Sequence, residues 1–245
     1  MSGTEQNREM YDRFGVHYHQ KRLALAGGAW NRWVDKPMIE SMLSGLESPS
    51  RTLDLGCGSG LLTRWLKEQG FDVRGLDFSE TLIEIARKEL PDIEFHLGDA
   101  KRTSLDAQSL DLVVSGLVMH YEPDLNPLFR EVARILEAGG RFVFTMHHPV
   151  MEVLNVNSDD LAAATMRPYF HSEPYRWMML DDEMELVSYH HTFESISAAL
   201  ESNGFVIEQI KEGRMPPEVA VEFPKDFART NAFPSFVGFR TRLTE

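Results

Sequence analysis

Three glycines, Gly56, Gly58 and Gly60, alternate with other residues directly after the apolar run that ends at Leu55. Residues 61–66 then show an apolar pattern at helical spacing. Glycine tolerates a positive φ and leaves no Cβ between the backbone and a ligand. The first turn of the following helix offers unpaired N–H groups. This stretch therefore predicts a buried strand that turns through glycines into a helix, with a ligand at the turn.

The spacing of the glycines distinguishes between classes of nucleotide ligand. A dinucleotide fingerprint, Gly-x-Gly-x-x-Gly, requires a glycine at the position of Leu61. The pattern present, Asp-x-Gly-x-Gly-x-Gly, resembles the first motif of the class I S-adenosylmethionine-dependent methyltransferases. An acidic residue at its start suits a ligand with an ammonium group and a sulfonium. The resemblance implies S-adenosylmethionine as cofactor and S-adenosylhomocysteine as product. The expected contacts here are Asp54, Gly56, Cys57, Gly58 and Gly60.

The composition excludes several other classes of protein. With 245 residues, 42% hydrophobic and 26% charged, the chain has the composition of an ordinary globular protein. Its formal net charge of −13 repels phosphate backbones, so we expect no nucleic-acid partner. No apolar run reaches the roughly 20 residues that span a bilayer, and residues 1–8 lack the order of a signal peptide. We therefore expect a cytoplasmic monomer or homodimer without a membrane partner.

Strand and helix patterns alternate along the chain after residue 50. We expect helices between the first six strands and a non-helical loop before the last one. The resemblance implies an α/β, Rossmann-like fold, with a seven-stranded mostly parallel sheet in the order 3-2-1-4-5-7-6, strand 7 antiparallel, and helices on both faces. The first strand is expected to end at residue 55. The other six are expected to cover 71–77, 93–99, 110–117, 141–146, 205–210 and 236–243.

The ends of the predicted strands carry further residues that suit a nucleoside. Asp77 lies 21 residues after the first glycine of the turn, where an acid can accept hydrogen bonds from both ribose hydroxyls, although it could also simply cap the next helix. Phe78 could lie against the adenine face. The resemblance implies that Asp99 and the Ala100 backbone bind the adenine, and that Ser115 lies under the methionine part.

The predicted elements divide the chain into four parts. These are an N-terminal helical cover (1–48), a cofactor-binding core (49–148), a substrate lid (149–191), and a helix and strands that complete the core (192–245).

Two of these parts are expected to cover the ligands. In related methyltransferases an N-terminal segment closes over the methyl donor, and Tyr11 and Tyr18 resemble its tyrosines, although these helices could also only cover a sheet edge. Insertions on the carboxyl side of a parallel sheet lie over the ligand crevice. We therefore interpret the segment with Tyr169, Tyr175 and Trp177 as a substrate lid rather than an irregular surface excursion.

Histidines at strand ends are the candidates for chemistry. His147 and His148 follow the fifth strand, and alternation predicts that one of them faces the crevice. His147 and His120 are the catalytic candidates, whereas Tyr121 and His148 are candidate substrate contacts. No helical His-x-x-x-His spacing supports a metal site, so we expect no metal.

The predicted activity is transfer of a methyl group from S-adenosylmethionine to a small molecule, with an oxygen, nitrogen or carbon atom as acceptor. The aromatic lid and the lack of a basic surface favour a small acceptor. Two alternatives stay open. The chain could be a non-catalytic binding module with a regulatory or scaffold role, or it could methylate a protein side chain or terminus.

Overall fold

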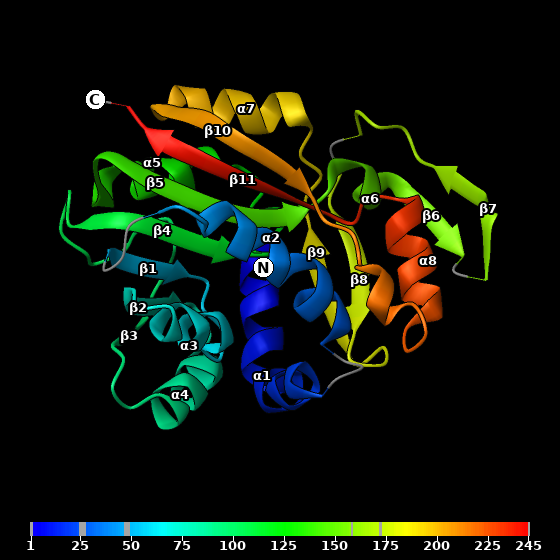
Figure 1. The fold of residues 1–245 in the computed structure, drawn as a ribbon, viewed down its shortest axis with the longest axis horizontal. Helices are drawn as coiled ribbons and strands as arrows, with labels where there is room; N and C mark the ends of the chain where they lie inside the picture. Colours follow the sequence, from blue (N-terminus) through cyan, green and yellow to red (C-terminus); the bar gives the residue numbers. More distant parts are fainter. Residues whose placement is uncertain (1, 25–27, 47–49, 158, 172, 245) are drawn as a thin grey trace.

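The computed structural model describes residues 2–24, 28–46, 50–157, 159–171 and 173–244. Its centre is a seven-stranded sheet in the order β10-β11-β5-β4-β1-β2-β3 (Figure 1). Neighbouring strands are parallel except in the two pairs that contain β11. This is the predicted order with an antiparallel last strand, so the fold prediction is confirmed. The strands are β1 (Arg51–Leu55), β2 (Asp72–Asp77), β3 (Phe95–Leu97), β4 (Leu110–Gly116), β5 (Leu136–His147), β10 (Phe205–Glu212) and β11 (Phe236–Leu243).

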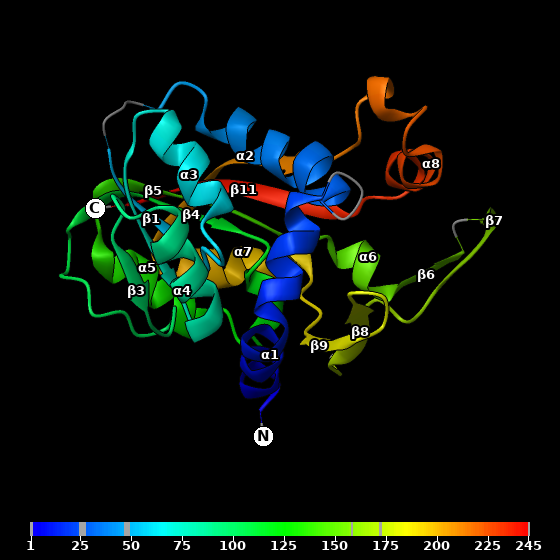
Figure 2. The ribbon, with the colours of Figure 1, turned by 90° about the horizontal axis from the view of Figure 1, so that it is seen from below.

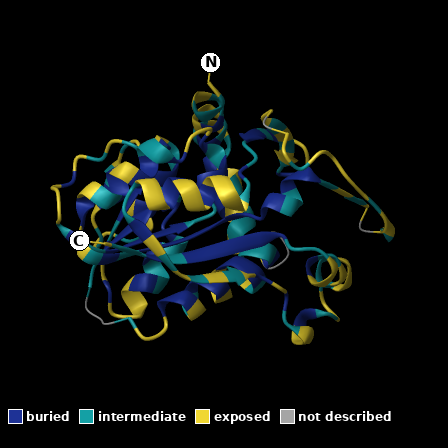
Figure 3. Cartoon of the chain, turned by 90° about the horizontal axis from the view of Figure 1, so that it is seen from above, coloured by how far each residue is buried: buried dark blue, intermediate teal, exposed yellow. Residues whose placement is uncertain are grey.

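Helices pack against both faces of this sheet, and the strands lie buried between helices whose outer sides are exposed (Figure 3). One face is covered by α2 and α3, whose apolar residues pack on β4 and β5. The other face is covered by α5 and α7. A further helix, α4, packs beside β2 and β3. The bounds are α2 (Lys36–Leu43), α3 (Leu61–Glu68), α4 (Glu80–Glu89), α5 (Asn126–Ile135) and α7 (Phe193–Ser202).

Local sequence explains where these helices begin and which face they bury. Ser79 precedes α4, and its hydroxyl accepts a hydrogen bond from the Leu82 backbone N–H at 3.3 Å, as expected for an N-cap. The apolar residues of α5 recur at helical spacing, and all four are fully buried: Leu128, Phe129, Val132 and Ile135.

Two of the predicted connections are wrong. Over residues 98–109, all of which the structure describes, the chain runs from β3 to β4 through turns and not through a helix. Asp99 accepts a hydrogen bond from the Lys101 backbone N–H at 2.9 Å, and such local bonds compete with helix formation. The last strand is reached through a helix, α8 (Pro224–Ala232). Its proline at the first turn favours helix entry, a signal that the sequence interpretation missed.

Two segments outside the core lie over the carboxyl ends of the strands. Helix α1 (Gly3–Leu23) packs between α4 and β9 (Figure 2). The Asn7 side chain fixes it there, because it donates to the Val187 carbonyl at 2.8 Å and accepts from the Val187 N–H at 2.9 Å. The insertion after β5 forms a short helix and two hairpins: α6 (Pro149–Val153), β6 (Leu154–Asn157), β7 (Asp160–Met166), β8 (Tyr175–Met179) and β9 (Met184–Ser188).

None of the helices in the described part of the chain is long and apolar enough to cross a membrane.

Candidate functional site

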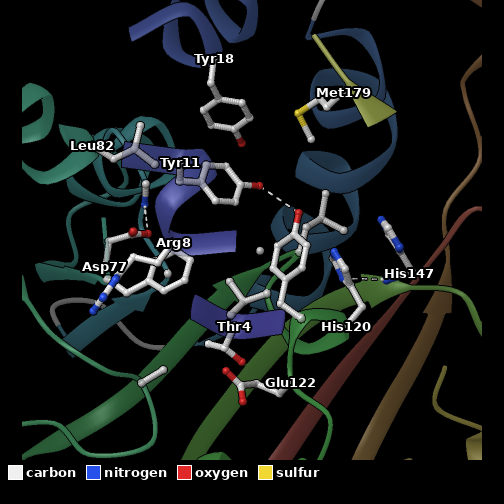
Figure 4. A pocket seen from close by; sticks show the side chains of 18 of the residues that line it. Thr4, Arg8, Tyr11, Tyr18, Asp77, Leu82, His120, Glu122, His147 and Met179 are labelled. Carbon is white, nitrogen blue, oxygen red and sulfur yellow. Dashed lines mark hydrogen bonds between the residues drawn. The ribbon is translucent and has the colours of Figure 1, made fainter. Parts of the chain in front are cut away.

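A cavity of about 1290 Å³ lies where β1, β2, β4 and β5 end, beneath α1 (Figure 4). Gly56, Asp77, Leu117 and His147 line it from these four strand ends. Side chains from α1, from the β8–β9 hairpin and from α8 complete the wall. Pockets for one small molecule typically measure about 300–1000 Å³. This cavity therefore has room for a nucleoside-sized ligand and a second molecule.

The glycine turn forms one end of the cavity. Gly56 and Gly58 have φ values of +75° and +55°, which glycine tolerates best. A Cβ at position 56 would overlap Val118 Cγ2, so this position excludes a side chain. The turn therefore brings the backbone itself to the ligand.

Asp77 stands beside this turn and is 5% exposed. One carboxylate oxygen accepts the Gly58 N–H at 2.8 Å and the other accepts the Ser79 N–H at 2.9 Å. Burial raises its pKa to about 6. Because each carboxylate oxygen has a second lone pair, Asp77 can hold the backbone and still accept ribose hydroxyls. The structure shows the helix-leading contact of Asp77 and leaves these lone pairs for the ribose hydroxyls, whose binding stays a prediction.

A side pocket of about 70 Å³ adjoins the turn and shares several lining residues with the cavity. Asp54 accepts the Thr63 hydroxyl at 2.6 Å through Oδ2, while its buried Oδ1 has no partner among the residues described. Burial raises the pKa of Asp54 to about 7 and that of Asp35 to about 6. Arg22 lines the same pocket and donates to the Tyr18 hydroxyl at 2.7 Å. Two carboxyl groups and a guanidinium thus suit the ammonium and carboxylate of an amino-acid group.

An aromatic and polar wall lies opposite, on the side of β2 and β3. Phe78, Asp99 and Ala100 line the cavity there, as predicted for an adenine site. Beside them, Lys101 forms an ion pair with Glu122 at 2.8 Å. These residues surround the region next to Asp77 with hydrogen-bonding groups and one aromatic face.

Tyrosines of α1 form the roof. The Tyr11 hydroxyl lies 2.9 Å from the Tyr121 hydroxyl. The Tyr11 ring packs edge-on against the Tyr18 ring, with 5.2 Å between the centroids (Figure 4). Burial raises the pKa values of Tyr11 and Tyr121, so both stay protonated at neutral pH. The roof thus joins the nucleoside end to the second half of the cavity.

That second half is built from stacked rings. His120 and His147 stack at 3.6 Å with an angle of 7° between their planes, and His147 also lies parallel to Phe236 at 5.9 Å. Trp177 meets His147 at 5.4 Å. The His120 Nδ1 accepts the His147 backbone N–H at 3.4 Å, which leaves the proton on its buried Nε2. Among the residues that the structure describes, none is a hydrogen-bond partner for this Nε2.

Polar groups lie behind His147, away from the cavity. Its Nδ1 is 2.8 Å from the Tyr175 hydroxyl and 3.8 Å from a Glu152 carboxylate oxygen. The other Glu152 oxygen lies 3.2 Å from His190 Nδ1. Burial lowers the pKa of His147 to about 3 and raises that of Glu152 to about 7. At neutral pH His147 is therefore uncharged beside a carboxyl group of unusually high proton affinity.

Comparison with known proteins identifies the family to which this chain belongs. A family model described as a methyltransferase domain matches residues 53–144. An S-adenosylmethionine-dependent methyltransferase from Mesorhizobium loti, known from its crystal structure, is 30% identical in sequence to this chain. The two structures match with a TM-score of 0.73, over 84% of this chain and 96% of that one. The chain belongs to the S-adenosylmethionine-dependent methyltransferases.

Curated relatives match this methyltransferase over shorter stretches. A demethylmenaquinone methyltransferase of Thermotoga maritima is 30% identical over 61% of this chain and 62% of its own length. A ubiquinone biosynthesis O-methyltransferase of Coxiella burnetii is 31% identical over 38% of this chain and 42% of its own. The chain thus spans less than two thirds of the length of these relatives.

The residues of the methyltransferase fit its donor. The buried Asp54 Oδ1 has no hydrogen-bond partner among the described residues, and a Cβ at Gly58, in the cavity wall, would meet only Leu82 Cδ1, at 3.9 Å. S-adenosylmethionine carries the ammonium and carboxylate that suit Asp54, Asp35 and Arg22, and the ribose that suits Asp77.

Many of the site residues predicted from sequence line the main cavity. These are Tyr11, Tyr18, Gly56, Gly58, Asp77, Phe78, Asp99, Ala100, His120, Tyr121, His147 and Trp177. Asp54 and Cys57 line the side pocket instead. Burial raises the pKa of Cys57, which keeps its thiol protonated and fits a packing role.

The other predicted site residues have structural contacts that the sequence did not show. The Ser115 hydroxyl donates to the Leu55 carbonyl at 2.7 Å. Gly60 packs closely against α4, where a Cβ would contact Leu90 at 2.9 Å. Neither Ser115 nor Gly60 lines the main cavity or the side pocket, and the ligand contacts expected of them stay predictions.

Three of the predicted substrate contacts also lie outside the cavity wall. His148 caps α6 and lies 3.0 Å from Glu212, because strand alternation turns it away from His147. Tyr169 packs edge-on against His190. Tyr175 stands behind His147 and reaches a substrate only through that ring.

Several lining residues were missed. Arg22 lies one helical turn after Tyr18, a spacing that places both on one face and that could have revealed it. Trp30, Met151 and the neighbouring pair Arg229 and Phe236 come from three distant segments, and no local pattern marks them.

Proposed function

We propose that this methyltransferase moves a methyl group from S-adenosylmethionine to a small, largely apolar molecule that binds beside His120 and His147. The observation that carries the proposal is the single cavity itself, which joins the glycine turn and Asp77 to the stacked rings of the strand ends. The cavity is larger than one ligand requires, and its second half is lined mainly by rings and methionines.

The donor, when bound, supplies a methyl group that its sulfonium already activates. The protein must then hold the acceptor in line and keep water away. Trp177 and Phe236 flank His147 and offer flat apolar surfaces to such an acceptor. Tyr11 of α1 and Tyr121, whose hydroxyls lie 2.9 Å apart, line the cavity between its two halves.

An oxygen or carbon acceptor must also lose a proton. The low pKa of His147 makes it a poor final proton carrier, whereas the Glu152 carboxylate behind it has a pKa of about 7. We assign His147 the role of accepting the acceptor's proton on Nε2, with the charge that forms on its ring offset by the Glu152 carboxylate, 3.8 Å from Nδ1. His120 lines the cavity and stacks on the His147 ring, which it holds in place.

The relatives support a small acceptor. The names of the Thermotoga and Coxiella proteins connect them with menaquinone and ubiquinone, which are small molecules. The Coxiella protein is described as an O-methyltransferase. The acceptor atom in this chain stays open between oxygen, carbon and nitrogen.

A transfer assay tests the proposal. The purified protein is incubated with methyl-labelled S-adenosylmethionine and a panel of hydroquinones, catechols, phenols and aryl amines, and label in organic extract and in protein is counted. We expect label in the extract for wild type and about a 100-fold loss in His147→Ala, with His171→Ala, an exposed histidine, as control. Label only in protein would favour a protein substrate. Donor binding without any transfer would favour a non-catalytic module.

A further inference from the structure

We propose that the acceptor carries a carboxylate and that Arg229 of α8 binds it. This inference rests on the proposed methyl transfer, and it names the chemical class of the second substrate.

A continuous row of flat groups leads from the reacting end to Arg229. His147 lies parallel to Phe236 at 5.9 Å, and Phe236 meets Trp30 at 5.9 Å. The Arg229 guanidinium carbon lies 5.6 Å from the centre of the Trp30 ring. All of these residues line the same cavity. The row thus offers an apolar surface that begins at the histidines and ends at a positive charge.

The Arg229 guanidinium is attracted by the Asp226 carboxylate, but the two groups form no ion pair in the described structure. Within the described residues, its side chain makes neither a hydrogen bond nor an ion pair. The nearest acid on its helix is Asp226, one turn earlier, which already accepts the Trp30 indole N–H at 2.9 Å. Partial burial lowers the pKa of Arg229. A half-buried, unpaired guanidinium in a cavity wall is a site for a planar anion that can take two N–H bonds.

The donor does not supply this anion. Its amino-acid end suits the side pocket, where Arg22 already stands with Asp35 and Asp54. Arg229, Trp30 and Phe236 line only the main cavity, on the side of the acceptor. The geometry therefore assigns Arg22 to the donor and Arg229 to the acceptor.

The alternative is a purely structural role, in which Arg229 stacks on Trp30 and holds α8 in place. The two roles differ in the ligands that they favour. Stacking alone gives no preference between an acid and its uncharged amide, whereas an anion site prefers the acid.

The test is a ligand-observed NMR titration of protein saturated with S-adenosylhomocysteine. The probes are benzoate, phenylacetate, 3-phenylpropionate and 4-phenylbutyrate, each paired with its carboxamide. The variants are Arg229→Gln, Arg229→Lys and, as matched control, Arg130→Gln, an exposed arginine of α5. Calorimetry with S-adenosylhomocysteine on each variant reports separately on the donor site.

In wild type and in the Arg130 variant, we expect at least one acid to bind about 10-fold or more tightly than its amide. The preference should vanish in Arg229→Gln, survive in part in Arg229→Lys, and leave donor affinity unchanged throughout. The inference is overturned if no acid outbinds its amide in wild type, or if the preference persists in Arg229→Gln. If wild type fails to bind S-adenosylhomocysteine, the proposed methyl transfer is refuted, and so is this inference, because it rests on that transfer.

Discussion

Replacing Asp54 by Asn should stabilise the empty protein at pH 8 and weaken donor binding at the same time. Asp54 is 1% exposed, and its Oδ1 has no partner in the described structure. The Thr63 hydroxyl donates to its other carboxylate oxygen, Oδ2, at 2.6 Å. The ionised group is therefore poorly solvated until a cation binds. Asn has the same shape, can accept the same Thr63 bond, and carries no charge.

The pKa of Asp54 gives the magnitude and the sign. Burial raises this pKa from 3.8 to about 7. Between these two values the native state binds more protons than the unfolded state, so the free energy of unfolding falls as pH rises. One pKa unit corresponds to about 1.4 kcal/mol, so the ionised group costs up to about 4 kcal/mol above pH 7. Asp54→Asn should recover part of this at pH 8 and little at pH 4.

Urea unfolding at pH 4, 6 and 8 and calorimetry with S-adenosylhomocysteine measure the two effects. We expect a stability gain that grows with pH and donor affinity about 10-fold or more weaker, since a bond to a charged group is lost. The control is Asp111→Asn, whose carboxylate pairs with Arg51 and has a lowered pKa, and which should lose stability at pH 8. An Asp54→Asn protein that is less stable at pH 8, or that keeps full donor affinity, would refute the reasoning.

Three further outcomes follow from the structure. Because burial lowers its pKa to about 3, the His147 ring should show no titration between pH 5 and 8 by NMR of labelled histidine, whereas a midpoint near 6.5 would contradict its burial. Gly56→Ala should abolish donor binding and destabilise the protein more than Gly45→Ala does. Both glycines have a positive φ, but a Cβ at Gly45 would have no neighbour within 4 Å. Equal falls in melting temperature in the two variants would refute the close approach of Val118 to Gly56. Asn7→Ala, which loses both bonds to Val187, should speed amide exchange in α1 by about 10-fold or more, and unchanged exchange would show that α1 is held otherwise.

The donor half of the site could be predicted from sequence because its residues follow strands directly. The glycine turn and Asp77 lie at fixed distances along one β-α-β segment, so their spacing alone brings them together. Asp99 and Ala100 follow the next strand in the same way. The order of the sheet strands was implied by the resemblance to the class I methyltransferases, and the structure has that order.

The acceptor half could not be predicted in the same way. Trp30 lies far in the sequence from Arg229 and Phe236, and it meets them only in the folded chain, where its indole N–H donates to Asp226 of α8 at 2.9 Å. The turn of α8 toward the cavity has no periodic signal. Alternation after β5 indicated that one of His147 and His148 faces the cavity. Which of the two does so is seen only in the structure, where His148 pairs with Glu212 instead.

The most direct test of the whole account is calorimetric titration of wild type, Asp77→Asn and Asp72→Asn with S-adenosylhomocysteine. Asp77 ends β2 inside the cavity, whereas Asp72 begins the same strand and is exposed, so the pair separates the ligand contact from a general change of charge. The account predicts binding by wild type and Asp72→Asn, and affinity about 10-fold or more weaker in Asp77→Asn. No binding by wild type, or equal binding by all three proteins, would contradict it.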